Sequence, residues 1–161
     1  MTTSDIEAQR IDPHMLTGER HLFADLGFHD VDADGCDLAM EMPVTAKVSN
    51  TRGALQGGLI ATLVDVVAGR AAVHALPPGF GAATSDMTLH YLSGVTVGPA
   101  RAEARVLRAG KRMVVVQVDV YDTGRNVLST TATATFVAME LREGQLDYRG
   151  PMPRKESKDS E

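Results

Sequence analysis

The sequence feature that most constrains the fold is a long apolar run, residues 59–76, that carries a single acid. The only strongly polar side chains in this run belong to Thr62, Asp65, Arg70 and His74. A helix of this composition has no proper solvent face, so we expect it to be buried nearly all round. An unpaired buried charge costs several kcal/mol. Asp65 is therefore either a hydrogen-bonded core acid, an acid at a subunit interface, or a functional residue.

The segment before the run favours a functional role for Asp65. Gly57 and Gly58 open the helix, and the first N–H groups of a helix have no partner within it. Together with the positive end of the helix dipole, these groups can bind an oxyanion or a polarised carbonyl. Asn50 and Gln56 add side-chain amide donors nearby. The segment thus supplies hydrogen-bond donors for a carbonyl, and the helix that follows supplies an acid that can activate water.

The spacing of these groups predicts an oligomer. Gly57 and Asp65 are eight residues apart, which at ~1.5 Å per residue separates them by ~12 Å along a helix. One small scissile group cannot touch both residues. If both act on the same bond, Gly57 of one chain must face Asp65 of another, which predicts a two-fold dimer with its sites at the interface. The monomer should then be inactive.

The residues Asn50-x-x-Gly53-x-x-Gln56-Gly57-Gly58, followed by six residues and Asp65, resemble a known motif. The motif is that of the hotdog-fold acyl-CoA thioesterases of the phenylacetate-pathway type, which include the mammalian thioesterase superfamily members. The similarity extends over about residues 35–140 and includes the segment 84–87 and the hairpin at 110–111. Members of this family commonly carry His where this chain has Gln56. Glutamine can donate a hydrogen bond but cannot carry a proton at neutral pH.

The resemblance implies an α+β hotdog fold, in which an antiparallel sheet of five or six strands wraps round one long central helix. It implies hydrolysis of an acyl-CoA thioester to free acid and CoA by a homodimer or a dimer of dimers (a homotetramer). The expected catalytic residues are Asp65, Gly57, Asn50, Gln56 and Thr84. The expected substrate-binding residues are Gly58, Val64, Ala68, Arg108, Lys111 and Arg112, the last three for the phosphates of CoA.

Several alternatives remain open at this point. Thr84 can equally be an ordinary strand residue, and a solvated hairpin tip explains the three basic residues near Gly110 equally well. Asp65 can act as general base on water or as nucleophile. Because Gln56 replaces the usual His, the alternative function is a hotdog module that binds acyl-CoA without hydrolysing it. A hydratase is disfavoured because residues 50–76 contain no Asp-x-x-x-x-His spacing.

The remaining pattern predicts the other elements of one domain, residues 17–141, between a flexible extension, 1–16, and a polar mobile tail, 142–161. A short helix is expected over 17–26, with Gly27 as its stop. A turn at 32–35 leads into a strand over 36–48. The central helix must end near the Pro77-Pro78-Gly79 sequence. Four more strands are expected over residues 82–92, 99–107, 113–121 and 127–139.

Composition limits the remaining function classes. The chain has 161 residues, of which 43% are hydrophobic, enough for one real core. Its net charge of −5 argues against nucleic-acid binding. Its polar N-terminus does not read as a signal peptide, and the polar residues in the apolar run argue against a membrane span. The lone Cys36 fits a reducing cytoplasm. We expect no metal, and no cofactor beyond the CoA part of the substrate.

Overall fold

The computed structural model describes residues 21–147 and 149. The elements run in the order α2 (Leu22–Asp25), β1 (His29–Val31), β2 (Leu38–Met42), the 3-10 helix η2 (Ala46–Val48), α3 (Gly57–Ala75), β3 (Phe80–Tyr91), β4 (Ala100–Ala109), β5 (Met113–Asp122) and β6 (Val127–Glu140). The predicted extension, residues 1–16, lies outside the described residues, as do the first four residues of the predicted helix and most of the predicted tail.

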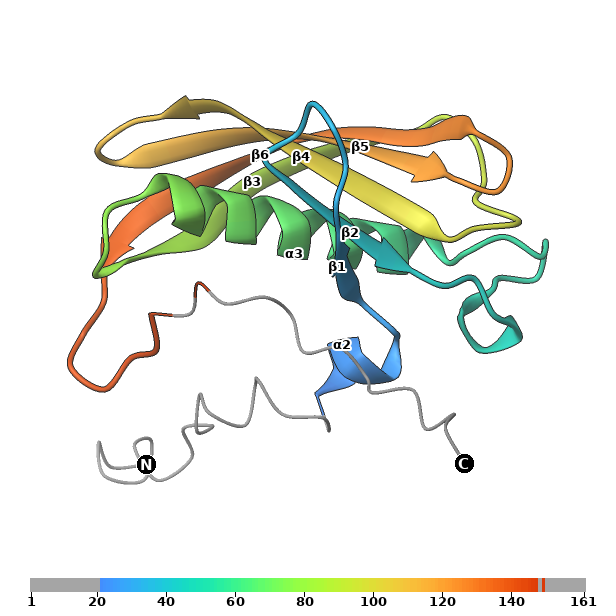
Figure 1. The fold of residues 1–161 in the computed structure, drawn as a ribbon, viewed down its shortest axis with the longest axis horizontal. Coiled ribbons are helices and arrows are strands. Elements are labelled where there is room, and N and C mark those ends of the chain that lie inside the picture. Colours follow the sequence, from blue (N-terminus) through green and yellow to red (C-terminus); the bar gives the residue numbers. More distant parts are fainter. Residues whose placement is uncertain (1–20, 148, 150–161) are drawn as a thin grey trace.

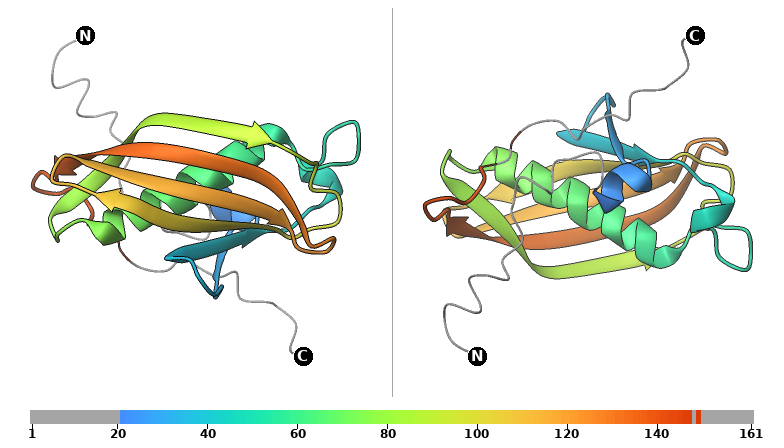
Figure 2. Two further views of the ribbon diagram at one scale, coloured as in Figure 1. Left: turned by 90° about the horizontal axis from the view of Figure 1, so that it is seen from above. Right: turned by 90° about the horizontal axis from the view of Figure 1, so that it is seen from below.

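Six strands form one antiparallel sheet in the order β1-β2-β4-β5-β6-β3. The sheet curves around α3, which lies along one of its faces (Figure 1). Seen from above and below, α3 crosses the strands obliquely (Figure 2). This arrangement confirms the predicted hotdog fold, and it leaves β1 and β3 as the two edge strands.

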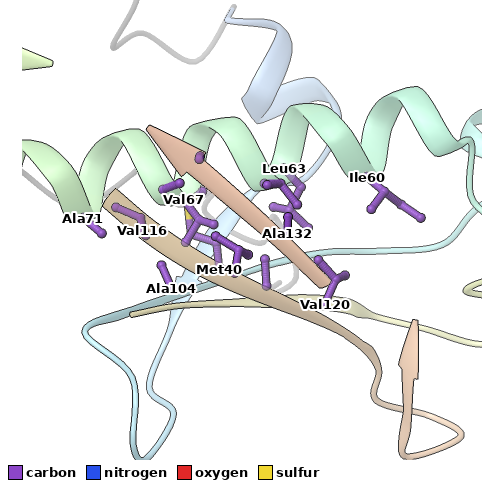
Figure 3. Packing of buried hydrophobic residues seen from close by; sticks show 14 of the residues in the cluster. Met40, Ile60, Leu63, Val67, Ala71, Ala104, Val116, Val120 and Ala132 are labelled. Atoms are coloured by element: carbon purple, nitrogen blue, oxygen red, sulfur yellow. The ribbon is translucent and has the colours of Figure 1, made fainter. Parts of the chain in front are cut away.

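The core fills the space between α3 and the sheet (Figure 3). Strand β5 shows how the sheet contributes side chains to the core. Side chains alternate between its two faces, and every second residue of this strand is fully buried. The buried residues are Val114, Val116, Val118 and Val120. On β4 the small side chains of Ala100, Ala102 and Ala104 are likewise buried, which lets the sheet approach the helix closely. Burial of apolar area of this kind stabilises a fold by ~25 cal/mol per Å².

One side of α3 packs on the sheet, through seven buried residues: Ile60, Leu63, Val64, Val67, Ala68, Ala71 and Ala72. A second stripe remains partly or fully exposed and recurs every three or four residues, as at Gly58, Thr62, Asp65 and Gly69. The prediction of burial all round is therefore wrong for a single chain, because the sheet covers only one side of the helix. By length and composition α3 could cross a bilayer, but its packing against the sheet identifies it as the core helix.

The N-terminal part differs most from the prediction. The predicted strand over residues 36–48 is wrong at both ends, since only Leu38–Met42 are extended and Ala46–Val48 form a 3-10 turn after Pro43. The strand His29–Val31 was not predicted, because three residues are too few to show an alternation; it pairs with β2 across the predicted turn at 32–35. The described part of the predicted helix is the short α2, which ends before Gly27, whose φ is +76°.

A buried carboxylate holds the loop between β3 and β4. Asp122 is fully buried. It accepts hydrogen bonds of 2.8 to 3.2 Å from the backbone N–H groups of Thr96, Val97 and Gly98. Burial by itself raises the pKa of this carboxyl, but the three backbone bonds and the nearby Arg125 guanidinium outweigh it, and the pKa lies below its ordinary value of 3.8.

An Asp122→Ala variant is expected to unfold with a free energy about 3 kcal/mol lower than wild type at pH 7, because buried N–H donors lose their acceptor. Since the folded-state pKa is depressed, the stabilisation is present above the unfolded-state pKa and is lost as pH falls through the folded-state value. The gap between the two proteins should therefore narrow below about pH 4. Urea unfolding at several pH values measures this gap. The exposed Asp34 provides the control, since Asp34→Ala should change stability by less than about 0.5 kcal/mol.

Candidate active site

The acid of the central helix is hydrogen-bonded across to the edge strand. Thr84 of β3 donates its Oγ1 hydrogen to Oδ1 of Asp65 at 2.7 Å. A β-bulge interrupts the pairing of β3 with β6 between Thr84 and Asp86, and bulges are frequent beside active sites. Asp65 is only partly buried in this chain, so its carboxylate keeps access to water. Thr84 therefore lies next to Asp65, as the resemblance implied.

The start of α3 presents free hydrogen-bond donors. Gln56 is the N-cap residue, and its carbonyl accepts bonds from the N–H groups of Leu59 and Ile60, at 3.0 and 3.1 Å. Within the described part of the chain, the N–H groups of Gly57 and Gly58 donate to no acceptor. Both lie at the positive end of the dipole of a 19-residue helix. The geometry thus suits an atom on which negative charge develops.

The two predicted amide side chains differ in their surroundings. Oδ1 of Asn50 accepts hydrogen bonds from the N–H groups of Arg52 at 2.9 Å and Ala54 at 3.2 Å. The Asn50 oxygen therefore shapes the loop that precedes α3, which leaves its amide nitrogen as the available donor. The Gln56 side chain is exposed and makes no hydrogen bond to the described residues. It is free to reach a bound molecule.

A cleft of about 290 Å³ lies beside the start of α3. It is lined by Asn50, Ala54, Leu55, Gly57, Ile60, Tyr91, Leu92, Ser93 and Gly94. The hydroxyl of Tyr91 donates to the carbonyl oxygen of Gly57 at 2.9 Å. The Tyr91 side chain and the 92–94 loop were not among the predicted site residues. The cleft has an apolar wall and a polar end formed by Asn50 and the helix start.

The remaining predicted site residues lie elsewhere. Val64 and Ala68 are fully buried in the core and do not line this cleft. Gly58 is exposed, and apart from its chain neighbours and the backbone of its own helix no atom lies within 4 Å of where its Cβ would be. Arg108, Lys111 and Arg112 are exposed at the β4–β5 hairpin, and no salt bridge within the described residues involves them.

The hairpin and the cleft lie at opposite ends of the sheet. The hairpin end of β5 pairs with the end of β6, Met113 beside Val137, whereas Tyr91 at the cleft pairs with Thr130 near the start of β6. In Figure 1 the hairpin accordingly lies near the C-terminal end of α3. One chain therefore brings Asn50 and Gly57 together at the cleft, which Gln56 does not line, and Thr84 to Asp65 further along α3. It does not bring the basic hairpin to the cleft.

Other polar groups have structural partners. Arg70 of α3 is paired with Asp30 of β1, with one bond of 3.0 Å. The thiol of Cys36 donates to the carbonyl of Ala33 at 3.3 Å. Burial, followed by the neighbouring Glu103 carboxylate, raises the pKa of this thiol, which disfavours the nucleophilic thiolate. Among the described residues, no group of three or more His, Cys, Asp or Glu side chains could hold a metal ion.

Residues 52–129 match the family model described as the thioesterase superfamily. A provisionally named esterase of Halobacterium salinarum is 33% identical over 133 residues, which cover 80% of this chain and 83% of that protein. The chain belongs to the thioesterase superfamily. A provisionally named esterase of Saccharolobus solfataricus is 35% identical to this superfamily member over 91 residues, which cover 56% of this chain and 59% of that protein.

Two solved structures share the fold of this superfamily member. The thioesterase HI1161 of Haemophilus influenzae superposes with a TM-score of 0.72 at 21% identity, covering 89% of this chain and 94% of that one. The BH2602 protein of Bacillus halodurans, solved with CoA, gives a TM-score of 0.65 at 26% identity, covering 84% of this chain and 82% of that one.

Proposed function

We propose that this protein hydrolyses acyl-CoA thioesters to a free acid and CoA. The observation that carries the proposal is the pairing of two features on one helix: free N–H donors at Gly57 and Gly58, and Asp65 held by Thr84. Membership of the thioesterase superfamily supports hydrolysis of a thioester or ester. The Bacillus halodurans relative that was solved with CoA supports CoA as the carrier group.

In the proposed reaction the thioester carbonyl lies against the N–H of Gly57, with the amide of Asn50 or Gln56 as a second donor. Negative charge develops on this oxygen as water attacks the carbonyl carbon. The donors are already oriented by the helix, so their stabilisation of the transition state costs no reorganisation. Formation of the C–O bond is followed by cleavage of the C–S bond, and the CoA thiolate leaves and takes up a proton.

Asp65 of a facing subunit activates the water in this proposal, and Thr84 orients its carboxylate. General-base catalysis of this kind contributes ~10²–10⁴-fold to a rate. A direct attack by Asp65 would instead form a transient anhydride that water then hydrolyses. A single turnover in ¹⁸O-labelled water separates these routes: the base route leaves Asp65 unlabelled, whereas the anhydride route places ¹⁸O in its carboxyl.

The proposed assembly is a dimer formed by the β3 edge and the exposed stripe of α3. The 12-residue strand β3 pairs with β6 on one side only, and long unpaired edges are normally covered in stable proteins. A second copy would also cover the partly exposed apolar residues of α3, such as Val66. It would bring Asp65 of one chain toward Gly57 of the other, which the ~12 Å separation on one helix requires. The basic hairpin is then free to bind CoA phosphates.

Thiol release from a panel of acyl-CoAs tests the proposed function. The panel comprises short and long aliphatic, phenylacetyl and hydroxybenzoyl thioesters, each given to wild type and to Asp65→Asn. We expect turnover of at least one thioester by wild type and its loss in the variant. Binding of acyl-CoA without thiol release by either protein would favour a non-catalytic acyl-CoA-binding module, the function suggested by Gln56 in place of a histidine.

A further inference from the structure

Tyr91 touches the start of α3 in two ways. Its hydroxyl donates to the Gly57 carbonyl at 2.9 Å, and its ring lies 3.6 Å from where a Cβ on Gly57 would be. Tyr91 is the last residue of β3, and the residue is 54% exposed although it lines the cleft. An aromatic ring left this open contributes little to the core. Its contacts are to the helix start and the cleft.

The hydroxyl bond restrains the peptide that carries one of the free donors. The Gly57 carbonyl and the Gly58 N–H belong to one planar peptide unit, so fixing the carbonyl fixes the direction of the N–H. Two consecutive glycines have more backbone freedom than any other pair. The Gln56 side chain makes no capping bond. Thr62 donates to the next carbonyl, that of Gly58, at 2.9 Å, and within the described part of the chain Tyr91 provides the side-chain hydrogen bond to the Gly57 carbonyl.

The ring also limits the width of the cleft. The apolar lining beside Tyr91 comes from Leu55, Ile60 and Leu92. Leu55 is part of the core: it is buried, and its N–H donates to the carbonyl of Val95 at 2.8 Å. Tyr91 and Leu92 are instead 54% and 59% exposed, so these two side chains are the parts of the wall whose removal widens the cleft without opening the core. Of the two, Tyr91 is the one whose ring contacts the helix start.

We propose that Tyr91 is a positioning and specificity-determining residue of the thioesterase site. Its hydroxyl orients the Gly57–Gly58 peptide, so that the free N–H of Gly58 stands beside the Gly57 donor as a further donor to the developing charge, and its ring sets the width of the acyl group that the cleft accepts. This inference rests on the proposed function. The hydroxyl and the ring act separately, so two different substitutions distinguish them.

The test measures kcat and KM of Tyr91→Phe and Tyr91→Ala on butyryl-CoA and phenylacetyl-CoA. Loss of one hydrogen bond predicts that Tyr91→Phe lowers kcat about five- to tenfold on both substrates, with KM within about twofold of wild type. Tyr91→Ala should in addition raise the ratio of kcat/KM for phenylacetyl-CoA to that for butyryl-CoA by about tenfold. Tyr121→Phe, on β5, is the matched control and should leave all values unchanged.

The orientation of the peptide has a readout that needs no activity. The ¹⁵N order parameter of the Gly58 amide should fall in Tyr91→Phe and stay at the wild-type value in Tyr121→Phe. An unchanged kcat together with an unchanged order parameter in Tyr91→Phe would overturn the positioning role. An unchanged substrate ratio in Tyr91→Ala would overturn the specificity role. If wild type releases no thiol from any acyl-CoA, the proposed function fails, and the order parameter still decides whether Tyr91 orients the turn.

Discussion

A Gly57→Pro variant is expected to lose about 10²–10³-fold in kcat on an acyl-CoA while folding as stably as wild type. Proline removes the N–H proposed to stabilise the developing charge, and deleting one such donor typically costs this factor. The backbone should accept the change. Gly57 is the first helical residue, the position at which proline is favoured. Gln56 before it has φ −56° and ψ 128°, the extended conformation that suits a residue preceding proline.

The matched control for this variant is Gly57→Ala, which keeps the N–H. A Cβ at this position would lie 3.6 Å from the Tyr91 ring, an ordinary van der Waals contact. The alanine variant should therefore retain most of the wild-type kcat, and thermal unfolding should give similar midpoints for all three proteins. A proline variant as active as the alanine variant would show that the Gly57 N–H does not act on the substrate.

An Asp65→Asn variant is expected to lose about 10³-fold or more in kcat, within the range that a general base contributes. Asparagine has the same shape as aspartate. Its side-chain oxygen can still accept the hydrogen bond that Thr84 Oγ1 donates to Oδ1 of Asp65 at 2.7 Å. What it lacks is a basic oxygen that can take a proton from water. The fold should therefore persist, which thermal unfolding measures. Substrate binding should also persist, and single-turnover kinetics separate it from the chemical step.

Asp86→Asn serves as the control for this variant. Asp86 is an exposed acid on β3, two residues from Thr84 and beyond the bulge. The same loss of one negative charge there should leave kcat within about twofold of wild type, since screening weakens long-range effects of exposed charges. If Asp86→Asn lowers kcat as much as Asp65→Asn, the effect of the latter would reflect general electrostatics and not proton transfer.

The sequence predicted those features that depend on local pattern. The start and end of α3 follow from the glycine pair and from Pro77-Pro78, and the observed helix spans Gly57–Ala75. The alternating valines of β5 placed that strand to within one residue. The contact between Thr84 and Asp65 was foreseen through the family resemblance, and the hydrogen bond between them is present.

The features that were missed depend on tertiary contacts. Tyr91 and Gly57 are 34 residues apart, and only the pairing of β3 at the edge of the sheet brings the ring to the helix start. The strand His29–Val31 exists because β2 offers it a partner, and its own three residues carry no pattern. Burial of α3 all round was inferred from composition, which cannot distinguish cover by the same chain from cover by a second one.

The central claim is that each site combines Gly57 of one chain with Asp65 of another, and a hybrid dimer tests it most directly. Chains carrying Gly57→Pro and chains carrying Asp65→Asn are coexpressed with different affinity tags, and the dimer that bears both tags is isolated. One of its two sites then contains both mutations and the other contains neither. Thiol release from an acyl-CoA should recover to about half of the wild-type rate, although each parent dimer is nearly inactive. A hybrid dimer as inactive as its parents, or active chains that remain monomeric, would contradict the claim.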